Sequence, residues 1–415
     1  MNYTYFLVSG RIWGIIIMLA CTTVACGGNS VQSASDDPYV VMLSMDGFRW
    51  DYADRVETPN LDYIAQNGVK AAYVKPVFPS KTFPNHYSMA TGLYPSNHGI
   101  VDNNFTCPDL GLSFRLGDRE MVENADFYAG EPIWVTAEKQ NITAASFFWV
   151  GSEAPVQGVH PTFWKRYDNR VSFQDRMDTV LYWLQLPVEK RPRLITFYFQ
   201  EPDSQGHKTG PDSEEINEMV MHLDSLLGSF ILKLKELPHY HRINFIVTSD
   251  HGMTEVSPER YVDITDYVSR DWFDLTHGGN PMIHVSPKEG MLDSVYNILK
   301  KVENISVWKK NEIPERLNYG NNPRIGDLVL LADSTWSIGW GKPRGTYYTG
   351  GAHGWDNAKK DMHTIFYAMG PAFRKSYQHT PFEVVDLYPL IAHILKLNPA
   401  PIDGKLERVE QMLLR

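Results

Sequence analysis

The stretch Ile243-Asn-Phe-Ile-Val-Thr-Ser-Asp-His-Gly252 joins a run of strand-forming residues to an acidic, histidine-bearing motif. Two other short runs, 39–45 and 193–199, are also rich in β-branched or aromatic residues, and each is followed by an acidic motif. Continuous apolar runs of this length are typical of strands that are buried on both faces. The three runs therefore predict strands of one buried sheet.

The residues between the second and third runs predict a helix. Asp212-Ser-Glu-Glu215 has the spacing of a capping box, and apolar residues recur at helical intervals from Ile216 to Leu234. A helix in this place makes the right-handed crossover that two parallel strands require. Because strand and helix signals alternate along the chain after residue 37, we predict an α/β fold with a mostly parallel central sheet and helices on both faces.

The acidic motifs are expected to meet at one edge of this sheet. In an open α/β sheet, ligands bind outside the carboxyl ends of the strands, so residues far apart in sequence share one crevice. Carboxylates and imidazoles occur here in equal number and without cysteine, which is the donor set expected of a catalytic zinc pair. Two such metals imply hydrolysis at phosphorus. The six candidate ligands are Asp46, Asp203, His207, Asp250, His251 and His353.

A further histidine, His277, is not predicted to bind metal. It lies in Thr276-His-Gly-Gly-Asn280, without a carboxylate beside it. Six ligands already fill two sites that keep open positions for substrate. We therefore expect His277 to be a loop residue or a group that only contacts the ligands.

A second motif, Pro79-Ser-Lys-Thr-Phe-Pro-Asn-His86, precedes a helix-compatible stretch. Thr82 is expected just before the first helical turn, where backbone N–H groups and the helix dipole favour a phosphate or an alkoxide. A bound metal would make the threonine hydroxyl nucleophilic, because it lowers the hydroxyl pKa as it lowers that of water. The spacing alone leaves open whether Thr82 is a nucleophile or only caps the helix, and Ser80 and Ser88 remain rival nucleophiles.

Composition limits the classes of function. The 415 residues are 43% hydrophobic and 21% charged, and the formal net charge is −10 with a pI near 5.8. The apolar content can fill a sizeable core, and the length is compatible with one large α/β domain. A general nucleic-acid-binding surface is excluded, because phosphate backbones demand clustered Lys and Arg.

The N-terminus predicts export. Arg11 precedes the apolar run 12–20, which is too short to span a bilayer as a mature helix. A basic residue followed by a short apolar run has the form of a signal peptide. We therefore expect an exported protein of the cell envelope.

Two cysteines follow this run, and each has a small residue before it, as in a bacterial lipobox. We expect lipidation at Cys26 or Cys21, with this lipid anchor as the membrane contact. Residues 1–38 are interpreted as signal peptide, lipobox and flexible tether, and residues 39–415 as a single catalytic domain. Cys107 is expected to be a packed free thiol.

Seven motifs occur in a fixed order between about residues 39 and 397: Ser-Met-Asp46-Gly-Phe-Arg, Lys-Thr82-Phe-Pro-Asn-His, His98-Gly-Ile-Val-Asp-Asn103-Asn-Phe, Phe147-Phe-Trp-Val-Gly-Ser, Asp203-x-x-Gly-His207, Ser-Asp250-His251-Gly-Met and His353-Gly-Trp. Their combination resembles the nucleotide pyrophosphatase/phosphodiesterase family of the alkaline phosphatase superfamily. The resemblance implies an alkaline phosphatase-like fold with the metal site at the carboxyl ends of the strands.

The resemblance also implies two Zn²⁺ ions per chain. One would be held by Asp203, His207 and His353, and the other by Asp46, Asp250 and His251. Thr82, at the second zinc, would be the nucleophile of a double displacement through a phosphothreonine intermediate. Asn103 matches the family asparagine whose amide donates to a phosphate oxygen.

Phe83 and Tyr167 match positions that sandwich the base in nucleotide-cleaving relatives, an arrangement suited to any flat ring. The resemblance favours an enzyme that releases nucleoside 5′-monophosphates from small nucleotide phosphodiesters. A choline- or lysophospholipid-type phosphodiesterase would keep the same metal core. A phosphomonoesterase and a non-catalytic surface metal-binding lipoprotein are further alternatives, but no cationic pair typical of phosphatases follows Asn103. Segments 108–127 and 308–344 are expected to form loops or small insertions near the cleft, and the oligomeric state is left open.

Overall fold

The structure is a computed structural model that describes residues 37–343 and 348–414. Its centre is an eight-stranded sheet in which, among the described strands, only β18 runs opposite to its neighbours. The strands, in their order across the sheet, are β19 (Tyr377–His379), β2 (Gly68–Ala71), β18 (Phe366–Met369), β9 (Ile243–Thr248), β1 (Tyr39–Met45), β8 (Leu194–Phe199), β6 (Ala144–Phe147) and β7 (Phe163–Lys165).

The three predicted strands are confirmed as the middle of this sheet. β1 and β9 have the predicted bounds, and β8 begins one residue later than predicted. β1 lies between the other two, with Val40 opposite Leu194 and Tyr39 opposite Ile243 in parallel register. The acidic motifs that follow these strands therefore leave the sheet at the same edge.

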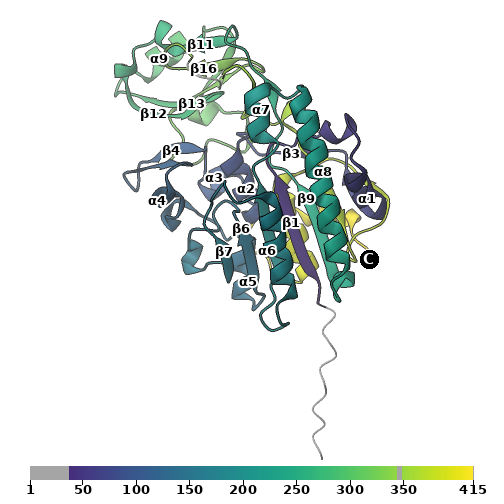
Figure 1. The fold of residues 1–415 in the computed structure, drawn as a ribbon. Helices are drawn as coiled ribbons and strands as arrows, with labels where there is room; N and C mark the ends of the chain where they lie inside the picture. Colours follow the sequence, from purple (N-terminus) through teal and green to yellow (C-terminus); the bar gives the residue numbers. More distant parts are fainter. Residues whose placement is uncertain (1–36, 344–347, 415) are drawn as a thin grey trace, which may run out of the picture. The chain divides into compact units, whose positions relative to one another are not determined.

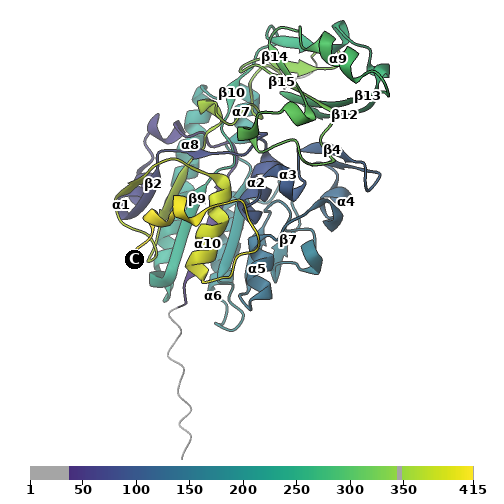
Figure 2. The same cartoon turned by 180° about the vertical axis from the view of Figure 1, so that it is seen from behind.

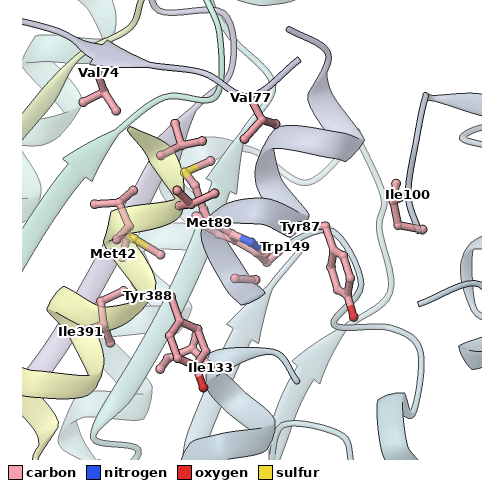
Figure 3. Packing of buried hydrophobic residues seen from close by; sticks show 14 of the residues in the cluster. Met42, Val74, Val77, Tyr87, Met89, Ile100, Ile133, Trp149, Tyr388 and Ile391 are labelled. Atoms are coloured by element: carbon pink, nitrogen blue, oxygen red, sulfur yellow. The ribbon is translucent and has the colours of Figure 1, made fainter. Parts of the chain in front are cut away.

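Helices cover both faces of the sheet, as predicted (Figures 1 and 2). Side chains of β1 alternate between two hydrophobic cores: Val40 and Met42 pack into one, and Val41 and Leu43 into the other. Figure 3 shows Met42 close to side chains of the helices on its own face. The first core contains α2 (Thr82–Thr91), α5 (Ile133–Lys139) and α10 (Leu387–Leu395), and the second contains α1 (Pro59–Asn67), α6 (Phe173–Gln185) and α8 (Glu214–Lys235).

The crossover helix α8 forms where predicted, but the predicted capping box is wrong. The N-cap is Ser213, whose hydroxyl oxygen accepts from the backbone N–H of Ile216 at 3.3 Å. Asp212 instead binds Arg49 at 2.9 Å and Arg55 at 2.8 Å. The two guanidinium groups hold the Asp212 carboxylate away from the helix end.

A smaller antiparallel sheet, here called the small sheet, has a core of its own. It consists of β12 (Phe273–Gly279), β13 (Met282–Pro287), β15 (Leu328–Ala332) and β14 (Ile305–Lys309), and α9 (Leu292–Leu299) packs against it. His277 lies in β12, so the expectation of a loop is wrong. Tyr319, between β14 and β15, donates to the carbonyl of Val101 at 2.9 Å and links this region to the segment after α2.

The remaining strands and α-helices of the described residues are short. They are β3 (Val74–Lys75) with β20 (Phe382–Glu383), β4 (Asn104–Cys107) with β5 (Leu112–Arg115), β10 (Thr254–Glu255) with β17 (Gly351–Ala352), β11 (Tyr261–Asp263) with β16 (Ser337–Gly339), and the helices α3 (Pro95–His98), α4 (Arg119–Val122) and α7 (Asp203–Thr209).

Residues from Asp37 onward form one compact unit. Cys107 is a buried free thiol, as predicted. Cys21 and Cys26, and the signal peptide expected around them, lie outside the described residues, so lipidation and the division at residue 38 stay predictions. Within 37–343 and 348–414, no helix is both long enough and apolar enough to cross a membrane.

Candidate active site and metal centre

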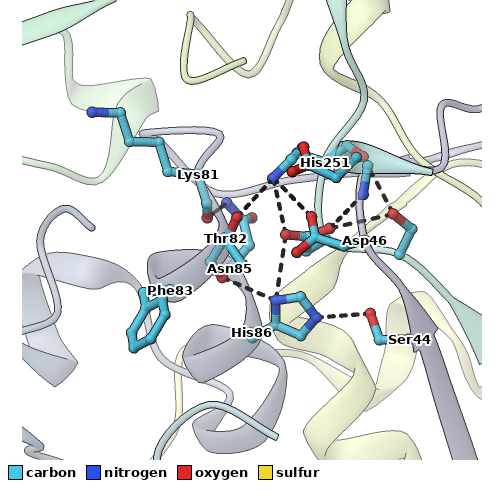
Figure 4. Close-up of polar contacts among 12 residues, drawn as sticks. Ser44, Asp46, Lys81, Thr82, Phe83, Asn85, His86 and His251 are labelled. Carbon is cyan, nitrogen blue, oxygen red and sulfur yellow. Dashed lines mark hydrogen bonds and ion pairs between the residues drawn. The ribbon is translucent and has the colours of Figure 1, made fainter. Parts of the chain in front are cut away.

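The predicted ligands come together at the carboxyl edge of the central strands. Asp46 directly follows β1, Asp250 and His251 follow β9, Asp203 is the first residue of α7, and His353 directly follows β17. Figure 4 shows Asp46 and His251 directed toward one another, with Thr82 beside them. The fold thus gathers side chains from five separate segments at one place, as the sequence predicts.

Among the described residues, two groups have ligand atoms within 4.8 Å of one another: Asp46, Asp250 and His251 in the first, and Asp203, His251 and His353 in the second. The first group is the predicted set. The second contains His251 where His207 was expected, although His207 Nε2 lies 3.4 Å from Asp203 Oδ1. His251 therefore belongs to both groups. Its ring stacks on the ring of His353, with 3.5 Å between the ring centroids.

Backbone carbonyl groups orient the three histidines. Nδ1 lies 2.8 Å from the Gly351 oxygen in His207, 2.9 Å from the Ser80 oxygen in His353 and 2.9 Å from the Gly252 oxygen in His251. A carbonyl oxygen only accepts hydrogen bonds, so Nδ1 carries the proton in each ring. Nε2 is then the nitrogen of each ring that would bind a metal ion.

The Nε2 atoms of His251 and His353 face carboxylate oxygens. His251 Nε2 lies 3.0 Å from Asp250 Oδ2 and 3.3 Å from Asp46 Oδ1, and His353 Nε2 lies 3.6 Å from Asp203 Oδ1. The same three oxygens are buried without a hydrogen-bond partner. Buried carboxylate oxygens without a hydrogen-bond partner repel one another and lose their hydration unless a cation lies between them. The residues present thus fit bound divalent cations.

The pKa values reflect this crowding of charge. Burial, together with the carboxylates of Asp250 and Asp203, raises the pKa of Asp46 well above its ordinary value. Burial also lowers the pKa of His353 well below its ordinary value, with a further contribution from His251 and His207. Against the effect of burial, His251 and His86 hold the pKa of Asp250 well below its ordinary range.

Thr82 lies next to the first group. It is the first residue of α2, and its Oγ1 is 3.2 Å from His251 Nε2. The N-cap of α2 is Lys81, so Thr82 does not cap the helix. The rival hydroxyls are buried and bound elsewhere: Ser80 donates to the Trp355 carbonyl at 2.8 Å, and Ser88 pairs with His98 at 2.9 Å. Among these three hydroxyls, the geometry favours Thr82 as a nucleophile.

A cavity of about 520 Å³ opens beside Thr82, and Phe83, Asn103 and Tyr167 all line it. The backbone N–H of Phe83 donates to Asn103 Oδ1 at 2.9 Å. Since the Asn103 carbonyl is thereby engaged, its NH₂ group is the part left to act as a donor.

The two segments of unassigned role differ in their relation to this cavity. Leu116, Arg119 and Val122 of segment 108–127 line it, as expected. The described part of segment 308–344 does not line it and instead contributes β15 and β16.

Three polar groups near the site were missed: Tyr198, His86 and an ion pair. Tyr198 donates to Asp46 Oδ2 at 2.6 Å, but it lies within a strand whose other residues are mostly apolar. His86 Nδ1 lies 3.0 Å from the Thr82 carbonyl oxygen and 3.3 Å from Asp250 Oδ2, while its Nε2 pairs with Ser44 Oγ at 2.8 Å. His86 belongs to the quoted Thr82 motif, so the sequence contained a signal for it.

The third missed group is an ion pair at the cavity wall. Arg119 is the only Lys or Arg among the described residues that line the cavity, and it binds the buried Glu153. Glu153 also accepts from the backbone N–H of Tyr167 at 3.0 Å. No pattern in the sequence links these residues, which are separated by more than thirty positions.

The chain is similar to proteins of known sequence. A family model described as type I phosphodiesterase / nucleotide pyrophosphatase matches residues 40–356. The human protein named ectonucleotide pyrophosphatase/phosphodiesterase family member 5 is 37% identical over 380 residues, covering 91% of this chain and 78% of the relative. A venom phosphodiesterase from Crotalus durissus collilineatus is 37% identical over 388 residues, covering 91% of this chain but only 47% of the venom protein.

Solved structures agree with these matches. A murine ectonucleotide pyrophosphatase/phosphodiesterase 5, described as an inactive variant in complex with AMP, has a TM-score of 0.87 and 37% identity. The match covers 91% of this chain and 100% of the murine one. The human counterpart has a TM-score of 0.86 and the same identity, covering 90% of this chain and 99% of its own. The predicted alkaline phosphatase-like α/β fold is confirmed.

Proposed function

Because the chain belongs to the type I phosphodiesterase / nucleotide pyrophosphatase family, we propose that it hydrolyses phosphodiester or phosphoanhydride bonds of small nucleotides and releases nucleoside 5′-monophosphates. The observation that carries the proposal is the position of the Thr82 hydroxyl. It lies 3.2 Å from a candidate metal ligand, His251, and in the wall of the cavity that also contains Phe83 and Tyr167.

The proposal includes two Zn²⁺ ions per chain. Asp46, Asp250 and His251 would hold one ion, and Asp203, His207 and His353 the other. Support comes from the three unpartnered carboxylate oxygens and from the His251 and His353 Nε2 atoms that face them. When bound, the ions would lower the pKa of a nearby hydroxyl and neutralise part of the charge on the phosphoryl group.

Thr82 would act as the nucleophile. Its Oγ1 forms a bond to phosphorus while the bond between phosphorus and the leaving oxygen breaks, and the hydroxyl proton passes to solvent. Water then attacks the phosphothreonine, the bond between phosphorus and Oγ1 breaks, Thr82 regains its proton and the nucleoside monophosphate departs. Asn103 would donate its NH₂ group to a non-bridging phosphate oxygen, where negative charge develops.

The nucleobase would lie against Phe83 and Tyr167. Both aromatic side chains line the cavity next to Thr82, and flat rings of any base stack on such side chains. The murine relative was solved in complex with AMP, which supports a nucleoside monophosphate as product.

The alternatives have less support. A phosphomonoester carries an additional negative charge, whereas Arg119, the only cation among the described cavity-lining residues, is already paired with Glu153. A choline- or lysophospholipid-type diesterase would use the same metal core, and no contact in the cavity favours it over a nucleotide. A non-catalytic metal-binding lipoprotein would have no use for the Thr82 hydroxyl in the cavity wall.

We also propose that the protein is exported. The relatives are named as ectonucleotide pyrophosphatases/phosphodiesterases or as venom phosphodiesterases, and both names describe enzymes that act outside the cell. The basic residue and short apolar run at the N-terminus have the form of a signal peptide. Lipid anchoring at Cys26 or Cys21 belongs to the same proposal.

A substrate panel tests the function. The values of kcat/KM for ATP, a dinucleotide, UDP-glucose, glycerophosphocholine and a phosphomonoester would be measured side by side with metal-loaded protein. We expect the nucleotide diesters and anhydrides to be preferred, with a nucleoside 5′-monophosphate as the released product. A preference for glycerophosphocholine or for the monoester would replace the proposal with the corresponding alternative.

A further inference from the structure

A buried ion pair joins the residue before the candidate nucleophile to the residue before Asn103, which would donate a hydrogen bond to the phosphate. Lys81 precedes Thr82, Asp102 precedes Asn103, and Lys81 Nζ lies 2.7 Å from Asp102 Oδ2. The exposed fraction is 4% for Lys81 and 0% for Asp102. The ion pair thus ties the segment that carries Thr82 to the segment that carries Asn103.

Lys81 does not take part in the chemistry itself. Figure 4 shows its side chain directed away from the Thr82 hydroxyl and from His251. It is also absent from the residues that line the cavity, so it does not contact a substrate placed there. Any effect of Lys81 on turnover must therefore act through its neighbours.

Lys81 also contacts two other segments. Its Nζ donates to the Gly279 carbonyl of the small sheet at 3.0 Å. A Cβ atom built on Gly354 would lie 2.9 Å from Lys81 Cε, so the lysine stem packs directly on the backbone next to His353. One side chain thus touches the Asp102 loop, the small sheet and the segment of a candidate metal ligand.

Asn103 is held from both sides. The Phe83 N–H donates to its Oδ1 at 2.9 Å, and the Asp102 carboxylate accepts from the Asn104 N–H at 3.2 Å through its other oxygen. Asp102 therefore fixes the backbone of the Asn103 loop while Lys81 fixes Asp102 to the Thr82 loop. The direction of the Asn103 NH₂ group depends on both contacts.

A buried ion pair of this kind costs desolvation free energy and contributes little to the stability of the fold. Burial raises the pKa of Asp102 even though Lys81 stands beside it, which reflects the desolvation of the carboxylate. Replacing a buried ion pair by uncharged side chains of similar volume is often neutral or stabilising, whereas removing one partner leaves an unpaired charge. A role in placing the neighbouring groups would explain why both charges are present here.

We propose that Lys81 and Asp102 form a positioning pair that places the Asn103 amide relative to the Thr82 hydroxyl, as attack on phosphorus requires. The proposal rests on the proposed function of Thr82 and Asn103. A displacement of about 1 Å at a reacting group costs on the order of 100-fold in rate, so loosening the two loops should lower turnover strongly.

The test uses the double variant Lys81→Met/Asp102→Asn, which removes both charges and keeps the acceptor for Asn104. We expect a folded protein with unchanged metal content and a kcat for a p-nitrophenyl nucleotide ester lowered by about 10- to 100-fold. The matched control is Lys309→Met/Asp293→Asn, an ion pair of the same 2.7 Å length at the surface of the small sheet, and its kcat should stay at the wild-type value.

A double-mutant cycle with Asn103→Ala identifies the path of the effect. If the ion pair acts by placing the Asn103 amide, removing the pair from the Asn103→Ala variant should lower kcat by less than about 3-fold. The reason is that effects of residues in one contact network are not additive. The affinity for AMP should fall in the double variant while that for adenosine, which has no phosphate, should not. Additive losses, or a wild-type kcat in the double variant, would overturn the positioning role. An inactive wild-type enzyme would instead refute the proposed function.

Discussion

Tyr198 donates its hydroxyl hydrogen to Asp46 Oδ2 at 2.6 Å, and this leaves Asp46 Oδ1 as the oxygen that faces His251. Tyr198 is buried near the end of β8, and Asp46 directly follows β1, the neighbouring strand. The bond fixes the rotation of the carboxylate, so Tyr198 orients a candidate metal ligand without binding the metal itself.

Tyr198→Phe should therefore weaken metal binding by about 10- to 100-fold, since outer partners of metal ligands have effects of this size. Competition with a chromophoric chelator measures the affinity. Tyr182→Phe is the control, because Tyr182 is exposed on α6 and should leave the affinity unchanged. Equal metal affinity in the wild type and in Tyr198→Phe would remove Tyr198 from the site.

Thr82→Ala should abolish turnover and leave the metal content intact. Loss of a nucleophile removes the covalent step, and we expect kcat for a p-nitrophenyl nucleotide ester to fall by at least about 1,000-fold. Thr82→Ser keeps a hydroxyl at the same place and should retain part of the activity. Denaturing mass spectrometry of acid-quenched wild-type enzyme should detect a phosphoryl adduct that Thr82→Ala lacks. Turnover near the wild-type rate in Thr82→Ala would exclude the residue as nucleophile.

Phe83→Ala together with Tyr167→Ala should raise KM for nucleotide substrates. Stacking of a base on an aromatic side chain contributes about 1–3 kcal/mol, which corresponds to a change of roughly 5- to 100-fold. A methyl p-nitrophenyl phosphate diester has no base and serves as the internal control, so its KM should change little. A similar rise in KM for both substrates would argue against base stacking.

Removal of the metals should lower thermal stability as well as activity. The unpartnered carboxylate oxygens of Asp46, Asp203 and Asp250 repel one another in the metal-free protein. Zinc at about 100 times its dissociation constant adds about 2.7 kcal/mol to the free energy of unfolding per site, so Tm should rise on addition of zinc. Elemental analysis should give two ions per chain, and Asp250→Asn should show a smaller rise in Tm. A metal-independent Tm would contradict the metal centre.

His98 should make the metal-free protein less stable in acid. Burial lowers the pKa of this histidine from 6.5 to about 3. Between these pH values the unfolded chain binds a proton that the folded protein excludes, so the free energy of unfolding falls as the pH is lowered, by at most about 1.4 kcal/mol per pH unit. Urea denaturation at pH 6.5, 5.5 and 4.5, in the presence of a chelator, measures this slope.

His98→Asn removes the titrating group and should give a shallower loss of stability with falling pH than the wild type. Comparing each protein with itself at pH 6.5 cancels the direct effect of the substitution on packing. His222→Asn, an exposed histidine on α8, should keep the wild-type slope. Identical slopes in the wild type and in His98→Asn would show that His98 does not contribute.

Strands buried on both faces could be predicted almost to the residue, because every position of β1 and β9 must be compatible with a buried environment. The strand β12, which contains His277, escaped prediction since most of its side chains are only half-buried and two of its seven residues are glycine. The N-cap of α8 was misplaced for a different reason. Asp212 is a good capping residue by its chemistry, but Arg49 and Arg55, from another part of the chain, bind it.

The sequence by itself determined the types of ligand and the edge of the sheet at which they meet, because short buried strands and the motifs after them are local patterns. Only the tertiary structure decided which atoms face one another: the bond between Tyr198 and Asp46, the contact of Lys81 with Asp102, and the place of His251 between two ligand groups. Such contacts depend on how loops from distant segments cross, and side-chain rotation within them is set by neighbours that no local pattern encodes.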